Sequence, residues 1–190
     1  DGNVYNPKTP MEAMDLGIGM VHQEFMLIPG FTVVENVKLN RENTRPTVVS
    51  KIFGKQMETL DKEQMIEDTK NALDKLNLNL DYNLPVKGLP VGYMQFIEIA
   101  REIDKSNLKV LILDEPTAVL TESEAEHFLE VIKKLSDLGI AILFITHRLD
   151  EIKSVTDNIT ILRDGKLVKS VKTEDISTIE MAGLMVGRNL

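Results

Sequence analysis

The sequence contains no cysteine, so no disulfide scaffold can hold the chain together. No apolar run approaches the roughly 20 residues that cross a bilayer as a helix, and no signal-peptide pattern is present, so we expect no transmembrane segment. The net charge is −8 without a clustered basic stripe, which argues against nucleic acid as a main partner. With 190 residues, 43% of them hydrophobic, one domain with a substantial core is expected.

The most informative segment covers residues 109–117. Val110 to Leu113 is a continuous apolar run, which predicts a strand buried on both faces, as in a parallel sheet. Asp114 and Glu115 follow at its carboxyl end, where open α/β sheets bind ligands, and Pro116 ends the strand. A bare Asp-Glu pair more often marks an acidic turn. The apolar run before it and the Pro-Thr after it favour a nucleotide-hydrolysis site, in which the acids handle a metal ion and a polarised water.

A second apolar run, residues 140–147, ends in His147. Between the two runs, Thr121-Glu-Ser-Glu124 has the pattern of a capping box and predicts one connecting helix. A strand, a helix and a parallel strand form a right-handed crossover, which would bring His147 close to the acid pair. A lone histidine is more often structural, but this position favours a functional one.

A third strand end is predicted at Gln23, after the segment 17–23, Gly-Ile-Gly-Met-Val-His-Gln. The strand follows a short helix opened by Thr9-Pro10-Met11-Glu12, a capping box with proline at the first helical position. A neutral amide can ligate Mg²⁺ or position a water without adding charge. Taken alone, a glutamine here is more often an ordinary loop residue, and the neighbouring His22 is predicted to be structural.

Together these segments resemble the ATP-binding cassette, the motor domain of ABC transporters. Gln23 matches the Q-loop glutamine, residues 110–115 match the Walker B strand with its catalytic glutamate, and His147 matches the switch histidine. Similarity to the simple-sugar and nucleoside importer branch lies in residues 20–25, 117–121 and 162–165. The resemblance implies an α/β fold: a P-loop NTPase-like (RecA-like) parallel sheet flanked by helices, with an inserted helical subdomain.

The family's signature, Leu-Ser-Gly-Gly-Gln, corresponds here to Leu89, Pro90, Val91, Gly92 and Tyr93. In the family, the serine hydroxyl and backbone N–H groups at a helix N-terminus hold the γ-phosphate of ATP bound to the partner cassette. Pro90 has neither a hydroxyl nor an N–H, whereas Gly92 still permits close backbone approach. We therefore expect a weakened signature rather than an absent one.

The phosphate-binding sequence Gly-x-x-x-x-Gly-Lys-Ser/Thr does not occur in the 190 residues. Without it there is no backbone nest or lysine for the phosphates and no hydroxyl ligand for Mg²⁺. The family carries this loop before the Q-loop strand, so we expect an N-terminally truncated cassette that lacks Walker A and its central strand. Either residues 159–162 would then pair with residues 142–145, or that edge would be open or covered by a second chain.

The resemblance also implies a division of the chain. Residues 1–35 and 106–190 would form a partial RecA-like catalytic core with a C-terminal hairpin and helix. Residues 36–105 would form the helical subdomain that carries the signature. Within this subdomain, residues 61–78 are predicted to be a strongly periodic helix, and residues 40–50 a polar loop.

In the full domain, with ATP and Mg²⁺ as cofactors, the resemblance gives each candidate residue a role. Asp114 would hold the Mg²⁺ through a water, and Gln23 would link the metal and the water to the membrane subunit. Glu115 would be the general base, and His147 would hold the γ-phosphate in the transition state. The fragment alone is expected to be inactive.

The implied function is the ATP-hydrolysing subunit of an ABC importer for a sugar or nucleoside, attached peripherally to the cytoplasmic face of the membrane. Its partners would be a second cassette and transmembrane permease subunits, whose short helix would dock beside the Q-loop. The candidate contacts, for which simple packing is an equal alternative, are Phe25, Met26, Leu27 and Phe31.

Two other functions are compatible with the same pattern. One is a non-catalytic coupling or interaction module with a decayed nucleotide site, which Pro90 and Tyr93 favour and the intact acids and histidine oppose. The other is a cassette ATPase outside transport, such as those of DNA repair, which the similarity to the sugar branch opposes.

Overall fold

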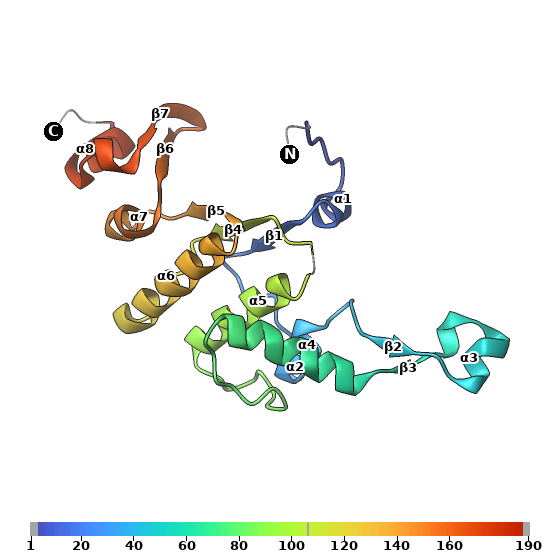
Figure 1. Cartoon of the computed structure of the whole chain (residues 1–190). Helices are drawn as coiled ribbons and strands as arrows, with labels where there is room; N and C mark the ends of the chain where they lie inside the picture. Colours follow the sequence, from blue (N-terminus) through green and yellow to red (C-terminus); the bar gives the residue numbers. More distant parts are fainter. Residues whose placement is uncertain (1–3, 106, 188–190) are drawn as a thin grey trace.

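The computed structural model describes residues 4–105 and 107–187 (Figure 1). A three-stranded parallel sheet in the order β1-β4-β5 lies at its centre. The strands are β1 (Ile18–Val21), β4 (Val110–Asp114) and β5 (Ala141–Ile145). Leu113 of β4 lies opposite Val21 on one side and Phe144 on the other, so the three strands end at the same edge. The predicted parallel sheet is confirmed.

The two faces of this sheet differ in exposure. Helices α5 (Val91–Ile103) and α6 (Glu122–Asp137) cover one face, where Leu111 and Leu113 are fully buried (Figure 1). On the opposite face Ile112 is only half-buried, and Leu143 and Ile145 of β5 are 52% and 43% exposed. The prediction that β4 is buried on both faces is therefore wrong, because the described helices that build the core lie on one side.

The C-terminal strands form a sheet of their own. Strands β6 (Asn158–Arg163) and β7 (Lys166–Lys172) are an antiparallel hairpin that packs against α7 (Leu149–Val155) and α8 (Thr178–Val186) through Ile159, Ile161 and Met181. In the described residues β6 pairs only with β7, so the expected pairing of residues 159–162 with β5 does not occur. Strand β5 is left with a neighbour on one side, which is the open edge expected as the alternative.

The main core joins the sheet to a group of helices. Helix α2 (Val33–Val37) and helix α4 (Lys62–Lys75) pack with α5, and α4 buries its predicted stripe at Met65, Thr69, Ala72 and Leu73. The same core cluster includes residues of both predicted subdomains, among them Val33, Val37, Leu73, Ile97, Leu111 and Phe128. The predicted division between residues 36–105 and the rest remains a prediction, and its ranges include residues 1–3, 106 and 188–190, which lie outside the described part.

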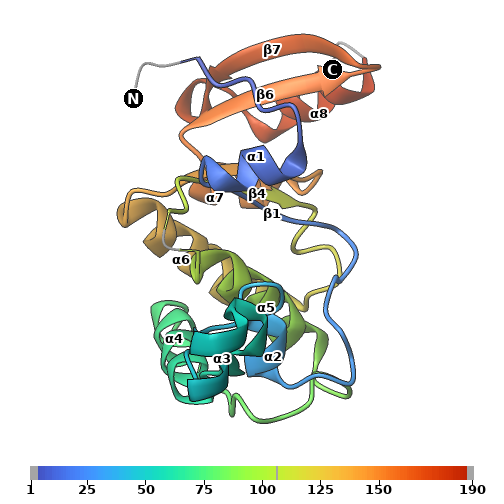
Figure 2. The ribbon, with the colours of Figure 1, turned by 90° about the vertical axis from the view of Figure 1, so that its right-hand side faces the viewer.

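An arm projects from the helical side of the molecule (Figures 1 and 2). It consists of β2 (Thr44–Arg45), α3 (Val48–Phe53), the 3₁₀ helix η1 (Lys55–Met57) and β3 (Thr59–Leu60). β2 and β3 pair antiparallel, so the polar loop predicted for residues 40–50 is wrong. Thr47 and Ser50 form a capping box that starts α3, a local signal that sequence analysis missed.

Capping explains where the helices begin. Thr9 caps α1 (Pro10–Asp15), Thr32 caps α2, Thr121 caps α6 and Ser177 caps α8, each by accepting a hydrogen bond from the backbone N–H three residues on. A second 3₁₀ helix, η2 (Thr173–Asp175), precedes α8. Over residues 4–105 and 107–187, the helices are too short or too polar to cross a membrane.

Candidate functional site

The carboxyl ends of β1, β4 and β5 bring three predicted site residues to one edge of the sheet. Asp114 is the last residue of β4 and lies opposite Ile145 in the register. Glu115 follows directly, and its backbone N–H donates to the Ile145 carbonyl at 2.9 Å. His147 comes two residues after β5 ends. The crossover predicted from the sequence is present, and it places the acids beside the histidine.

Glu115 and His147 are in direct contact. His147 Nδ1 lies 2.9 Å from Oε1 and 2.8 Å from Oε2 of Glu115. Since an ionised carboxylate only accepts, the imidazole donates through Nδ1–H, and Nε2 remains available to a substrate. The Glu115 side chain is 25% exposed and that of His147 is 66% exposed, so the pair faces solvent and a ligand can reach it.

The backbone at Glu115 is unusual. Its φ of 49° lies in the left-handed region, which is uncommon for a residue with a side chain. Such strain persists only where the surroundings hold the residue in place, and it concentrates at functional sites. Here the hydrogen bond from the Glu115 N–H to β5 holds the backbone of the residue, and the contact with His147 holds its side chain.

Helix α7 supports the segment after Glu115. The hydroxyl of Thr117, which is fully buried, donates to Glu151 Oε2 at 2.6 Å, and Arg148 Nη1 donates to the Thr117 carbonyl at 3.0 Å. Arg148 Nη1 also lies 2.9 Å from Glu151 Oε1. Sequence analysis missed Glu151 and Arg148, whose positions in a short helix give no sign that they reach back to the Pro116-Thr117 turn.

Gln23 reaches the same edge from β1 but makes no hydrogen bond to Asp114 or Glu115 within the described residues. The predicted Mg²⁺ donors, the Asp114 carboxylate and the Gln23 amide, are oxygen ligands of the kind that Mg²⁺ accepts beside waters and phosphates. The described residues contain no group of three or more histidines and acids that could form a complete metal cage. That Asp114 and Gln23 bind Mg²⁺ therefore stays a prediction.

The predicted signature lies at the start of α5. Pro90 is the N-cap residue and provides no side-chain cap, as its chemistry requires, while Val91 and Tyr93 are exposed. Gly92 is buried, and a Cβ built there would lie 2.5 Å from Glu124 Oε1 and 2.9 Å from Glu124 Cδ. Glycine at this position therefore leaves room for the Glu124 side chain against the start of α5. Leu89 is half-buried against the core.

The loop after Gln23 contains the four predicted permease contacts. Met26 and Phe31 are exposed and Phe25 is half-buried, so these three side chains are accessible. Leu27 is buried in the main core, which corrects its assignment as a contact in favour of simple packing. The loop backbone is bound by Glu98 and Asn36, two residues that sequence analysis missed.

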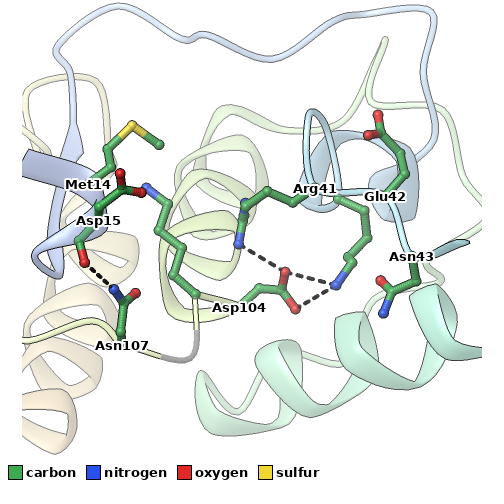
Figure 3. A pocket seen from close by; sticks show the side chains of 9 residues that line it. Met14, Asp15, Arg41, Glu42, Asn43, Asp104 and Asn107 are labelled. Carbon is green, nitrogen blue, oxygen red and sulfur yellow. Dashed lines mark hydrogen bonds and ion pairs between the residues drawn. The ribbon is translucent and has the colours of Figure 1, made fainter. Parts of the chain in front are cut away.

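A cavity of about 380 Å³ lies at the opposite end of the sheet (Figure 3). Lys38 and Arg41 face Asp104 there, with Lys38 Nζ 3.1 Å and Arg41 Nη1 3.1 Å from Asp104 Oδ2. Lys38 also bonds Asp68 at 2.8 Å. These ion pairs join the segment after α2 to the end of α5.

Comparisons of the sequence and of the fold with known proteins agree with one another. The family model described as "ABC transporter" matches residues 1–118. The galactose/methyl galactoside import ATP-binding protein of Clostridium tetani is 39% identical over 183 residues, which cover 96% of this chain and 35% of that protein. The glucose import ATP-binding protein of Haloferax volcanii is 39% identical over 202 residues, covering 96% and 36%. The chain thus spans about a third of the length of these curated relatives.

A solved structure with a similar fold is a nucleotide-free ATP-binding cassette from an ABC transporter. It superposes with a TM-score of 0.73 at 24% identity and covers 95% of this chain and 68% of that one. At this level of identity the likeness concerns the fold, and it confirms the predicted P-loop NTPase-like architecture.

Proposed function

Because the chain belongs to the ABC transporter family, we propose that it forms part of the ATP-hydrolysing subunit of an importer for a small hydrophilic solute. The galactose and glucose import proteins to which it is similar favour a sugar, and a nucleoside is the alternative within the same branch. The whole protein would act with a second cassette and with transmembrane permease subunits, peripherally at the cytoplasmic face of the membrane.

The observation that carries this proposal is the contact between Glu115 and His147 at the edge where Asp114 ends β4. Glu115, with its carboxylate at 25% exposure, would accept the proton of the attacking water as general base. His147 would keep Glu115 oriented by donating from Nδ1 and, as an imidazolium with an N–H on both ring nitrogens, would donate from Nε2 to a γ-phosphate oxygen in the transition state.

Asp114 and Gln23 would hold Mg²⁺. The metal, when bound, would neutralise charge on the phosphate oxygens. Asp114 would hold the Mg²⁺ through a water. Gln23 lies at the start of the accessible loop, and it would link the occupancy of the Mg²⁺ site to the part of the loop that contacts the permease. Residues 89–93 would approach the nucleotide of the partner cassette through backbone groups at the start of α5, with Gly92 permitting the approach and Pro90 weakening it.

The test uses a double-mutant cycle in the whole protein. Glu115→Ala and His147→Ala should each lower ATP hydrolysis by about 10²–10⁴-fold, the range for a general acid–base group. Since the two side chains act as a unit, the double variant should lose little more than the worse single one. Losses that multiply, or single variants with an unchanged rate, would contradict the proposal.

A non-catalytic coupling module is the second candidate, and the uncapped start of α5 at Pro90 favours it. In that case the whole protein would bind its partners without hydrolysing ATP. Pro90→Ser, which introduces a hydroxyl cap, is a useful companion variant. A rise in ATP hydrolysis would support a signature that is weakened but still works, and would oppose a nucleotide site that has lost its function.

A further inference from the structure

The loop between β1 and α2 has a fixed backbone and outward side chains. It contains neither helix nor strand over residues 22–31, and it runs along the outside of the molecule from β1 to α2 (Figure 2). Met26 is 57% exposed, and Ile28 and Phe31 are exposed as well. A loop that exposes apolar side chains in this way would be mobile unless its backbone groups had partners elsewhere.

Two charged residues of α5, the buried Glu98 and the partly exposed Arg101, provide those partners at Met26. The Met26 N–H donates to Glu98 Oε1 at 2.7 Å, and Arg101 Nη1 donates to the Met26 carbonyl at 3.3 Å. Arg101 Nη2 closes the arrangement by donating to Glu98 Oε2 at 3.1 Å. Glu98 is 1% exposed, and a buried carboxylate is retained only when it is paired and hydrogen-bonded. We call Glu98, Arg101 and the Met26 peptide the loop clamp.

A second buried side chain binds the loop from α2. Asn36, which is fully buried, accepts from the Ile28 N–H at 2.7 Å and donates to the carbonyls of Ile28, Phe31 and Thr32. The loop is therefore attached to α5 at Met26 and to α2 at Ile28.

The two helices are in turn fixed to each other. Asp104 follows α5 and pairs with Lys38 and Arg41, which follow α2. Figure 3 shows Arg41 beside Asp104. Arg41 Nη2 also donates to the Val37 carbonyl of α2 at 3.1 Å and to the Arg101 carbonyl of α5 at 2.5 Å. The loop, α2 and α5 are thus linked to one another by polar contacts at three separate places. These links would allow the loop and the two helices to move as one unit.

We propose that Glu98 is a positioning residue: through the loop clamp it ties the outward-facing loop at Met26 to α5, so that a displacement of the loop by a partner moves the residues 89–93 at the start of that helix. This proposal rests on the proposed function, because it assigns the loop to the permease contact and the start of α5 to the partner cassette's nucleotide. Glu98 itself touches neither; it acts through Met26 and Arg101.

Helix α5 offers a matched control. Glu102 is also a buried carboxylate, one turn further along, but it bonds Lys105 just after the end of the helix and approaches Arg101 no closer than 4.0 Å. Replacing Glu102 removes a buried charge from α5 and leaves the Met26 N–H with its partner. Glu98→Gln, by contrast, keeps an acceptor for that N–H and removes the charge that pairs with Arg101.

The experiment compares Glu98→Ala, Glu98→Gln and Glu102→Ala in the whole protein, assembled with its permease where ATP hydrolysis is measured. Hydrogen exchange at the Met26 amide should become about tenfold faster or more in Glu98→Ala, the effect of losing a hydrogen bond to a charged group. It should be partly restored in Glu98→Gln and unchanged in Glu102→Ala. The ratio of solute-stimulated to unstimulated ATP hydrolysis should fall most in Glu98→Ala, less in Glu98→Gln, and should be unchanged in Glu102→Ala.

The outcomes separate the two proposals. Unchanged Met26 exchange in Glu98→Ala, or an equal effect of Glu102→Ala on exchange and on the stimulation ratio, would overturn the positioning role. Faster exchange with a fully retained stimulation ratio would overturn it too, since the clamp would then carry no signal. If the parent protein hydrolyses no ATP, the proposed function fails, while the exchange data alone still decide whether Glu98 holds the loop.

Discussion

Replacing Asn36 by alanine tests how much the loop depends on one buried side chain. Asn36 makes four hydrogen bonds, but most of its partners have a second one. The Ile28 carbonyl also accepts from the Phe31 N–H, the Phe31 carbonyl from the Val86 N–H, and the Thr32 carbonyl from the Asn36 N–H. Only the Ile28 N–H has no other acceptor in the described structure.

The expected loss in the free energy of unfolding is therefore that of one orphaned backbone donor, about 1–3 kcal/mol, rather than the sum over four bonds. Against a total of roughly 5–15 kcal/mol, this shift is easily measured by urea unfolding followed by circular dichroism. Asn83→Ala, at an exposed turn, is the control and should change stability by less than about 0.5 kcal/mol. A loss in Asn36→Ala no larger than that of the control would refute the reasoning.

Three further predictions follow from the same structure. Burial raises the pKa of Glu98, against the opposing charge of Arg101 and with smaller effects from the Met26 N–H, Glu102 and His22. The folded chain therefore binds this proton more tightly than the unfolded chain does, and stability falls as the pH rises from about 4.5 through the raised pKa. The difference in Tm between Glu98→Gln and the parent should accordingly increase across that window, and a constant difference would contradict the assignment. Because the 190 residues contain no Gly-x-x-x-x-Gly-Lys-Ser/Thr, calorimetry on this chain should detect no micromolar ATP binding, and a micromolar affinity would disprove the expectation. Thr121→Ala removes the cap of α6 and should cost about 1 kcal/mol in thermal or urea unfolding, whereas an unchanged midpoint would show that the cap contributes nothing.

The strand ends were predictable because their signals are local. The apolar runs before Asp114 and His147 and the capping box at Thr121 together specify a crossover, and the crossover alone brings His147 to Glu115. The cap at Thr9 was readable for the same reason, since it lies within three residues of its partner.

Other features were not predictable because they depend on contacts across the fold. Glu98 and Met26 are 72 residues apart, and a glutamate in an amphipathic helix gives no sign of such a partner. Likewise, β4 has the composition of a strand buried on both faces, yet one of its faces is only half-covered. The composition of a strand indicates which side chains could be buried, but it does not indicate whether a helix is present to cover them. The arm over residues 44–60 was hidden by its polar residues and Pro46.

In the proposed mechanism, Glu115 takes the proton of the attacking water at the edge of the β1-β4-β5 sheet. The most direct test of this step is single-turnover hydrolysis by the whole protein carrying Glu115→Gln, with ATP binding measured on the same sample. The amide keeps the size of the side chain but cannot act as a base, so we expect retained ATP binding and hydrolysis slower by about a hundredfold or more. An unchanged hydrolysis rate would contradict the proposed mechanism.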